Sequence, residues 1–323
     1  MKNPSVTVLL VTYNHINTFE KAIQSVLSQK TTFPVTIIIL DDASTDGTVE
    51  LINKYKNLEN VKCILREKNA GGTTNIYEGL KLVNTKYFAA LETDDYWCDE
   101  NKLQTQVDIL EKHPECSFCA HNTLVKYAGS SKTRYYIKDV PDKIFKFPPE
   151  EIKRRYYIEP HPSSRLYRTE CLNLEEIKNP VIATYDVATN FYFLTKGNLY
   201  YLNKVMSVYN CSGSGVYSGI SSYRQRYKTA SVILQLNKEF GFKYNRLLSR
   251  FFSTRLNLNF LTYLRLRYSK NPENLDKMYD CILENYEKKY LNNRDKKPVC
   301  YLSLPLSKKS SLVLELRREK DRA

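Results

Sequence analysis

The sequence lacks any apolar run that approaches the roughly 20 residues needed by a helix to span a bilayer. It also lacks a charged and then apolar leader, because an apolar strand pattern begins almost at once, at Val6. It has no internal repeat and no low-complexity linker. From these absences we expect a globular protein of the cytoplasm, or one that lies peripherally on the inner face of the cytoplasmic membrane.

Cysteine, histidine and glycine are present, but not in the patterns of several common sites. Eight scattered cysteines are typical of free thiols in a reducing compartment rather than of a disulfide framework. The set His113, Cys116, Cys119 and His121 looks like a zinc motif, but its spacing is too short, so we assign no structural metal. The segment 12–15, which follows the first apolar run, is not a glycine-rich, basic phosphate-binding loop.

Apolar runs and helical patterns alternate through the first hundred residues. Strands are expected at 6–12, 35–40, 61–65 and 87–91, and the first three are each followed by an amphipathic helical pattern. This order is typical of an α/β fold, and a polar cluster follows every strand. Because ligands bind outside the carboxyl ends of the strands in open α/β sheets, we expect these clusters to converge on one crevice.

The most informative cluster is Glu92-Thr93-Asp94-Asp95, directly after the fourth apolar run. Two adjacent carboxylates repel one another when they are buried, so they call for a cation. Carboxylate oxygens on a loop suit Mg²⁺ or Mn²⁺, and such ions usually keep open positions for phosphate oxygens. By itself the pair could equally be two solvated aspartates that cap the helix expected from Asn101.

The other clusters suit a nucleotide. A tyrosine at position 13 could stack on a base, and Asp42 could accept a hydrogen bond from N3–H of uracil. The pair Gly71-Gly72 would let backbone amides approach a ligand closely. Each feature also has an ordinary structural explanation, because Tyr13 could pack under a loop and Asp42 could satisfy turn amides.

In chain order, the segments 11–14 (Val-Thr-Tyr-Asn), 41–48 (Asp-Asp-Ala-Ser-Thr-Asp-Gly-Thr), 69–75 and 92–97 (Glu-Thr-Asp-Asp-Tyr-Trp), with Lys102-Leu103-x-x-Gln106 downstream, resemble those of the family 2 inverting glycosyltransferases with a GT-A fold. The resemblance covers about the first 220 residues. It implies a Rossmann-like mixed sheet flanked by helices. It also implies an Mn²⁺- or Mg²⁺-dependent enzyme that moves a sugar from a nucleotide-diphosphate sugar, most simply a UDP-sugar. The implied acceptor is a hydroxyl of a glycan or lipid-linked glycan, in surface polysaccharide, lipooligosaccharide or glycoprotein glycan synthesis.

The resemblance also assigns roles to single residues. Those implied to bind the donor are Thr12, Tyr13, Asn14, Asp42, Asn69, Gly71, Asn75 and Asp94. The cation would be held by Asp95, with Asp94, in a DXD-like motif whose first position is Glu92 where many members have aspartate. The catalytic base would be Asp186, although an isolated acidic residue before an apolar helix is more often an N-cap.

One position departs from the family pattern. Relatives often carry a histidine where Ser212 stands, in a glycine- and serine-rich segment (211–219) that we expect to act as a lid. His161, in a Pro-His-Pro segment that lines the acceptor side in relatives, could supply the missing contact, or it could be a loop histidine held by its prolines. Upstream of the lid, residues 200–209 are expected to form a strand pair.

Charge divides the chain into two expected domains. Residues 1–222, the GT-A catalytic domain, carry 26 Lys and Arg against 25 Asp and Glu, whereas 223–323 carry 23 against 10. The second part shows apolar residues at helical spacing, which predicts a basic helical extension. Such a surface could bind an anionic membrane, or could simply be a solvated face; nucleic acid ranks lowest as a partner because no nucleic-acid motif accompanies the charge.

Two other functions compete with sugar transfer. A sugar-1-phosphate nucleotidyltransferase also builds a nucleotide crevice on a Rossmann-like sheet, but the missing phosphate loop at 12–15 disfavours it. An inactive nucleotide-sugar-binding scaffold at the membrane is the alternative that is not an enzyme. The acidic residues Asp94, Asp95 and Asp186 disfavour the scaffold, and the serine at position 212 mildly favours it.

Overall fold

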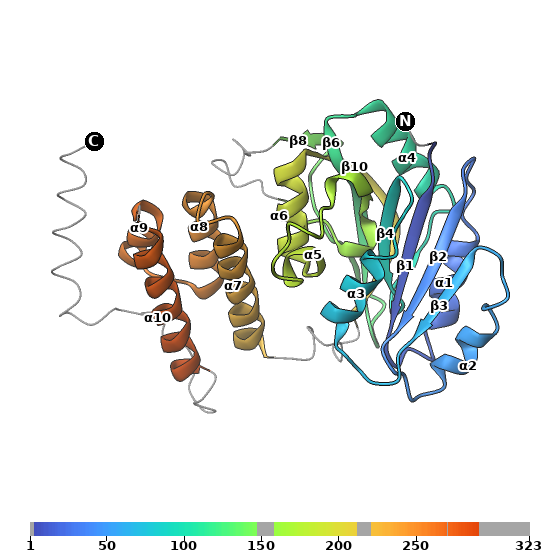
Figure 1. Ribbon diagram of the computed structural model, residues 1–323, viewed down its shortest axis with the longest axis horizontal. Coiled ribbons are helices and arrows are strands. Elements are labelled where there is room, and N and C mark those ends of the chain that lie inside the picture. The colour runs from blue at the N-terminus through green and yellow to red at the C-terminus, as the bar shows by residue number, and fades with distance from the viewer. Residues whose placement is uncertain (1–2, 147–157, 212–220, 270, 291–323) are drawn as a thin grey trace. The chain divides into compact units, whose positions relative to one another are not determined.

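The computed structural model describes residues 3–146, 158–211, 221–269 and 271–290. The chain divides into two compact units, Met1–Gly215 and Val216–Ala323. The N-terminal unit is built on a mixed β-sheet, and the described part of the C-terminal unit is helical (Figure 1).

Among the described residues, ten strands make up the sheet of the N-terminal unit. Eight follow the order β3-β2-β1-β4-β9-β6-β10-β5, with β7 paired to β6 and β8 paired to β10. Their bounds are β1 (Val6–Thr12), β2 (Val35–Asp41), β3 (Val61–Leu65), β4 (Tyr87–Glu92), β5 (Tyr96–Trp97), β6 (Cys116–Tyr127), β7 (Thr133–Tyr135), β8 (Lys143–Phe145), β9 (Leu166–Arg168) and β10 (Asn198–Cys211). The four strands expected near the N-terminus are confirmed.

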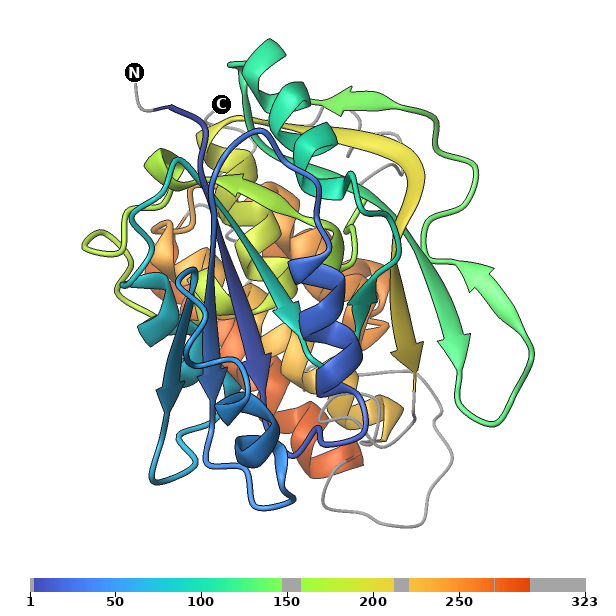
Figure 2. The ribbon, with the colours of Figure 1, turned by 90° about the vertical axis from the view of Figure 1, so that its right-hand side faces the viewer.

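The strands β1 to β4 are parallel neighbours, and β9 then runs antiparallel to β4. All seven residues of β1 are buried, as expected for a strand that is covered on both faces. One face packs on α1 (Phe19–Leu27) and α4 (Lys102–Lys112), which lie together in front of the strands in Figure 2. This arrangement sends the carboxyl ends of the parallel strands to one edge.

The remaining helices of this unit lie along the same sheet. They are α2 (Thr48–Asn53), α3 (Gly72–Leu80), α5 (Val181–Thr184) and α6 (Asp186–Lys196), with short 3₁₀ turns at Pro162–Ser164 and Thr169–Cys171. In Figure 1, α3, α5 and α6 cover the face of the sheet opposite to α1. The helix α3 contacts β1, β2 and α5, so α3 and α5 close one side of the crevice.

The prediction of a strand pair at 200–209 is wrong, because these residues belong to the single strand β10. Its pairing with β6 shifts register between Leu202 and Val205 and again between Val205 and Ser207. Such irregularities bend a strand without ending it. The polar break in the sequence pattern at Asn203 and Lys204 therefore marks a bulge and not a turn.

The C-terminal unit contains α7 (Ser222–Glu239), α8 (Asn245–Leu256), α9 (Phe260–Tyr268) and α10 (Pro272–Tyr290). The helix α7 packs on α8 and α10, and α9 packs on α8 and α10. At its centre Tyr279 donates a hydrogen bond to Asn245 Oδ1 (2.8 Å) and meets Phe252 edge-on. Across the described ranges, neither unit contains a helix with both the length and the apolar character needed to cross a membrane.

Candidate active site

Hydrogen bonds tie together the carboxyl ends of three parallel strands. Backbone N–H of Asp42 donates to Thr12 O (3.1 Å), and that of Thr93 donates to Val11 O (3.0 Å). The side chains of His15 and Thr93 add a contact of 2.9 Å between Nδ1 and Oγ1. The loops that were expected to converge after β1, β2 and β4 therefore lie side by side.

The residues after β1 present an aromatic ring and a polar turn. Tyr13 is 43% exposed, so its ring is available for stacking. Asn14 adopts a left-handed conformation (φ 55°), accepts from Thr45 N–H (2.7 Å) and donates through its own N–H to Ser44 (2.8 Å). Thr12 is buried, and its hydroxyl has no hydrogen-bond partner among the described residues. The structure thus gives Asn14 a role in shaping the turn. That Thr12 and Asn14 contact the nucleotide-sugar donor stays a prediction.

Both oxygens of the Asp42 carboxylate are used by the loop after β3. They accept hydrogen bonds from Ala70 N–H (2.8 Å) and Gly71 N–H (2.9 Å), and Asn69 Oδ1 also accepts from Gly71 N–H (3.1 Å). Gly71 has φ +84°, and nothing lies within 4 Å of the position that a Cβ would take. Asp42 therefore orders this loop, and its remaining lone pairs are what it could offer to a base.

Arg66 is a cation at the crevice to which the sequence assigned no role. Its Nε donates to Asn75 Oδ1 (3.0 Å) and lies 4.0 Å from Asp42 Oδ1. Asn75 is fully buried, and its Nδ2 donates to Leu40 O (2.9 Å). The amide of Asn75 is thus committed to orienting Arg66, which the sequence could have flagged as a cation directly after β3.

Three carboxylates cluster at the end of β4. Glu92 is accessible to solvent, but the protein that surrounds it, together with the charges of Asp94 and Asp186, raises its pKa to about 8. Burial also raises the pKa of Asp94, against the opposing effect of His15. Burial and then the charge of Asp94 raise the pKa of Asp95 well above its usual range. The cluster therefore carries repulsion that a cation would relieve.

The donor set fits a hard divalent cation that shares its shell with a ligand. Oδ1 of Asp94 is buried and has no hydrogen-bond partner in the part of the chain that the structure describes. Within that same part, no three His, Cys, Asp or Glu side chains are grouped closely enough to hold a metal by themselves. Mg²⁺ is commonly held by one or two carboxylates plus substrate phosphates, so Asp94 and Asp95 suit an ion that arrives with a diphosphate.

His161 lies beside the acidic pair. Its Nδ1 is 3.8 Å from Asp95 Oδ2 and 2.8 Å from Ser163 Oγ, and its ring stacks on Tyr209 at 4.5 Å. Burial, and then the charge of Arg165, lower the pKa of His161 to about 3, so the ring is neutral. Whether it replaces the histidine missing at Ser212 stays a prediction, and Ser212 lies outside the described residues, as does most of the expected lid.

Asp186 is the first residue of α6, on the opposite side of the crevice from β4. It is accessible to solvent, but only within a concave site, and the surrounding protein raises its pKa. The nearby Arg165 guanidinium opposes that effect. Nη1 of Arg165 donates to Asp186 O (3.0 Å), and its Nε donates to Pro160 O (2.9 Å), so one buried arginine links the His161 segment to the start of α6. No sequence signal pointed to Arg165.

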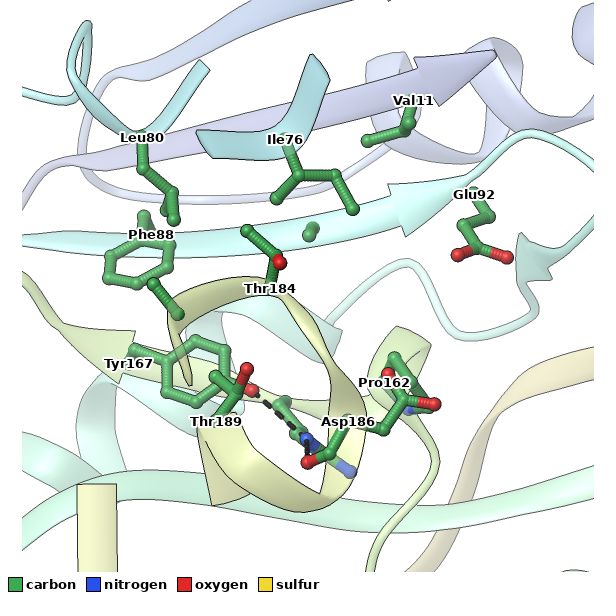
Figure 3. Close-up of a pocket in the computed structure, with 13 residues that line it drawn as sticks. Val11, Ile76, Leu80, Phe88, Glu92, Pro162, Tyr167, Thr184, Asp186 and Thr189 are labelled. Atoms are coloured by element: carbon green, nitrogen blue, oxygen red, sulfur yellow. Dashed lines mark hydrogen bonds between the residues drawn. The ribbon is translucent and has the colours of Figure 1, made fainter. Parts of the chain in front are cut away.

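A single pocket brings these elements together (Figure 3). Glu92 and Asp186 lie toward one end, and Leu80, Phe88 and Tyr167 lie toward the other. The cavity volume of about 60 Å³ is room enough for several water molecules or a small group. Two carboxylates from different elements thus face one space that is apolar at its back.

Comparison with known proteins identifies the family. Residues 7–173, more than half of the chain, match the family model described as glycosyl transferase family 2. An uncharacterized protein of Mycobacterium tuberculosis is 36% identical over 129 residues, which cover 39% of this chain and 37% of that protein. The Escherichia coli UDP-Glc:α-D-GlcNAc-diphosphoundecaprenol β-1,3-glucosyltransferase WfaP is 37% identical over 108 residues, 33% of this chain and 41% of WfaP. The chain thus spans less than half of the length of these curated relatives.

Solved structures agree on the fold. S. aureus TarS 1–349 in complex with UDP-GlcNAc is similar with a TM-score of 0.59 at 17% identity, over 88% of this chain and 81% of that chain. At that identity the likeness concerns the fold alone. By its sequence match and its architecture, the chain belongs to glycosyl transferase family 2 and has the GT-A fold that its motifs predict.

Proposed function

We propose that the chain is a metal-dependent inverting glycosyltransferase that moves a sugar from a nucleotide-diphosphate sugar, most simply a UDP-sugar, to a hydroxyl of a glycan or lipid-linked glycan. The observation that carries this proposal is the pairing of two adjacent carboxylates, Asp94 and Asp95, with a pocket that Asp186 faces from another element; Oδ1 of Asp94 has no hydrogen-bond partner among the described residues. The proposed diphosphate site and the proposed base are close enough for the charge of Asp186 to act on Asp95.

The donor would lie along the carboxyl ends of β1 to β4. Tyr13 offers its exposed ring to the base, and Asp42 offers its remaining lone pairs to the base edge. The guanidinium of Arg66 is close enough to Asp42 to serve the same ligand, and the loop leaves open space at Gly71. Asn75 contributes by holding Arg66.

Asp95 and Asp94 would hold the Mn²⁺ or Mg²⁺ ion. When bound, such an ion neutralises charge on the diphosphate and stabilises it as a leaving group. The contribution of the protein is to keep two carboxylates together and poorly solvated. Asn210 does this in part, since its backbone N–H donates to Asp95 Oδ1 (3.0 Å) and its side chain donates to Asp94 O (2.6 Å).

Asp186 would act as the general base. The acceptor oxygen forms a bond to the anomeric carbon while the bond from that carbon to the diphosphate oxygen breaks, and the hydroxyl proton passes to Asp186. A direct displacement of this kind inverts the anomeric configuration. Arg165 is suited to keep Asp186 ionised, because it is permanently charged, buried and bonded to the backbone of Asp186.

The names of similar proteins support the choice of ligands. WfaP is named for UDP-Glc as donor and for a GlcNAc-diphosphoundecaprenol acceptor, and TarS is described in complex with UDP-GlcNAc. Both names combine with the crevice described above to favour a UDP-sugar. The WfaP name also favours an acceptor on a lipid diphosphate, and hence a role in surface polysaccharide, lipooligosaccharide or glycoprotein glycan synthesis.

The test is a panel of nucleotide sugars with Mn²⁺ or Mg²⁺, in which nucleotide binding and transfer to a lipid-linked glycan extract are both measured. We expect Asp95→Ala to lose metal-dependent donor binding. We expect Asp186→Asn to bind the donor but to lose transfer by two orders of magnitude or more, in line with roughly 10²–10⁴-fold for a general base. Asp108→Asn, at an exposed carboxylate on α4, is the matched control.

The same panel separates the competing functions. Glu92→Gln distinguishes the two carboxylates of the pocket. If Glu92→Gln loses transfer and Asp186→Asn keeps full activity, Glu92 is the base. Release of pyrophosphate from a sugar phosphate and UTP would indicate a nucleotidyltransferase. Binding of UDP without transfer to any acceptor would indicate a scaffold, and absence of nucleotide binding would refute the proposal.

A further inference from the structure

The helix α9 in the C-terminal unit has apolar residues on both of its faces. On the inner face Leu266 is fully buried. On the outer face Leu261 is 66% exposed, Tyr268 is 53% exposed and Leu264 is partly exposed. Because these three residues stand at i, i+3 and i+7, they form one stripe along the helix. A surface helix of a soluble domain normally turns polar side chains outward, so this stripe needs an explanation.

The hairpin of α8 and α9, which carries the stripe, has charged residues of one sign only. Residues 245–269 contain five arginines and no Asp, Glu or Lys. The acidic residues of 221–290 stand elsewhere, at Glu239 and along α10. There they form ion pairs such as Lys238 with Asp276 (2.6 Å) and Lys277 with Glu273 (2.9 Å). The helical hairpin of α8 and α9 is therefore cationic in its own sequence.

The presence of arginine, with no lysine in this segment, narrows the chemical class of the partner. A guanidinium can donate two parallel hydrogen bonds to a phosphate, whereas lysine offers a single point charge that would serve equally for solubility. In this hairpin Arg246 and Arg255 are exposed, and Arg267 directly precedes Tyr268. Phosphate groups are therefore the chemistry that suits this surface.

We propose that α9 docks the C-terminal unit on a membrane rich in anionic phospholipid. Leu261, Leu264 and Tyr268 enter the boundary between headgroups and acyl chains, and the exposed arginines of α8, Arg246 and Arg255, bind lipid phosphates. Apolar side chains and arginines together are what an interfacial helix needs, since it lies in the plane of the membrane. The tyrosine suits that depth because its ring is apolar and its hydroxyl stays in water.

A soluble polyanion is a poorer occupant of the same surface. Nucleic acid or polyphosphate would engage the arginines but would leave Leu261 and Leu264 in water, with no gain from their exposure. A lipid surface uses both features. Docking needs neither a nucleotide sugar nor catalysis, so it does not rest on the proposed function and can be tested without it.

The first experiment measures sedimentation of the full chain with vesicles of phosphatidylcholine and with an equimolar mixture of phosphatidylcholine and phosphatidylglycerol. We expect binding to the mixed vesicles that weakens as salt is added. The double variant Leu261→Ser/Tyr268→Ser should bind at least about tenfold more weakly. The matched control is Leu58→Ser/Tyr135→Ser, which makes the same two changes at exposed residues of the N-terminal unit. The double variant Arg246→Gln/Arg255→Gln tests separately how much the arginine charges contribute to binding of the mixed vesicles.

The second experiment uses fluorescence. The chain has a single tryptophan, Trp97, which is 3% exposed and donates to Ser163 O (2.9 Å), so its emission is a constant background. In Leu261→Trp we expect a blue shift with the mixed vesicles and quenching by brominated lipid. Leu58→Trp should show neither effect.

Three results would overturn the proposal. One is an absence of binding to the mixed vesicles. Another is vesicle binding that is unchanged in Leu261→Ser/Tyr268→Ser, together with no blue shift of the emission in Leu261→Trp. The third is binding to single-stranded RNA or polyphosphate without any binding to vesicles, which would assign the arginines to a soluble polyanion.

Discussion

The buried guanidinium of Arg165 offers the most direct test of how the site is held together. It bonds to the carbonyl oxygens of Pro160 and Asp186, which stand in two segments that the sheet does not connect to each other. Replacement by methionine keeps much of the volume but removes the charge and all of these hydrogen bonds. Replacement by lysine keeps the charge but cannot reach both carbonyl groups.

The cost of Arg165→Met can be worked out from these contacts. The carbonyl oxygens of Pro160 and Asp186 both lose the guanidinium as a donor, and each group left unsatisfied costs about 1–3 kcal/mol. We therefore expect the free energy of unfolding to fall by about 2–6 kcal/mol, which most domains of this size would survive. Urea denaturation followed by circular dichroism measures this loss.

The same substitution should move the pH profile of sugar transfer. The surrounding protein raises the pKa of Asp186, and Arg165 lowers it. Without the arginine the pKa of Asp186 rises further, so the base is protonated at pH values where the wild type is active. The acidic limb of kcat/KM should therefore shift to higher pH in Arg165→Met and should stay close to the wild type in Arg165→Lys.

The decisive comparison is between the two variants at equal folded fraction. Transfer is measured across pH at a temperature where circular dichroism shows both variants folded. If the acidic limb of Arg165→Met coincides with that of the wild type, Arg165 is a structural link only, and the electrostatic argument fails. If Arg165→Lys shifts as far as Arg165→Met, the geometry of the link matters and its charge does not.

Three further predictions concern stability and donor binding. Asn75→Leu should cost about 1–3 kcal/mol in urea and weaken nucleotide binding through a misplaced Arg66, and unchanged nucleotide affinity would contradict this role for the amide. Gly197→Ala should lose about 1–3 kcal/mol, because its Cβ would lie 2.9 Å from Ser117 N, and a variant as stable as the wild type would show that this contact relaxes freely. Burial lowers the pKa of Lys102 from 10.5 to about 7, so the folded state binds fewer protons than the unfolded chain between these values. The free energy of unfolding should therefore rise with pH from about 7 to about 10 in the wild type and should be flatter in Lys102→Met, as urea titrations at each pH would show.

The strands and the polar clusters of the first hundred residues were predictable from the sequence because their signal is local. A strand covered on both faces, such as Val6–Thr12, must be apolar throughout, and the loop that follows must be polar. The parallel order then places each loop at the same edge without further information. The prediction at 200–209 failed for a related reason, since a bulge and a turn look alike in a pattern that records only polarity.

The contacts that complete the candidate site come from tertiary packing. Sequence patterns pointed to Asp94, Asp95 and Asp186, but the shared pocket of Glu92 and Asp186 exists only because β4 and α6 pack together. The link made by Arg165 likewise joins residues whose proximity no local periodicity records. The sequence by itself thus determined the family, the first four strands and the acidic motif. Only the tertiary structure decided which charges meet, because burial and distance between remote segments set the strength of electrostatic interactions.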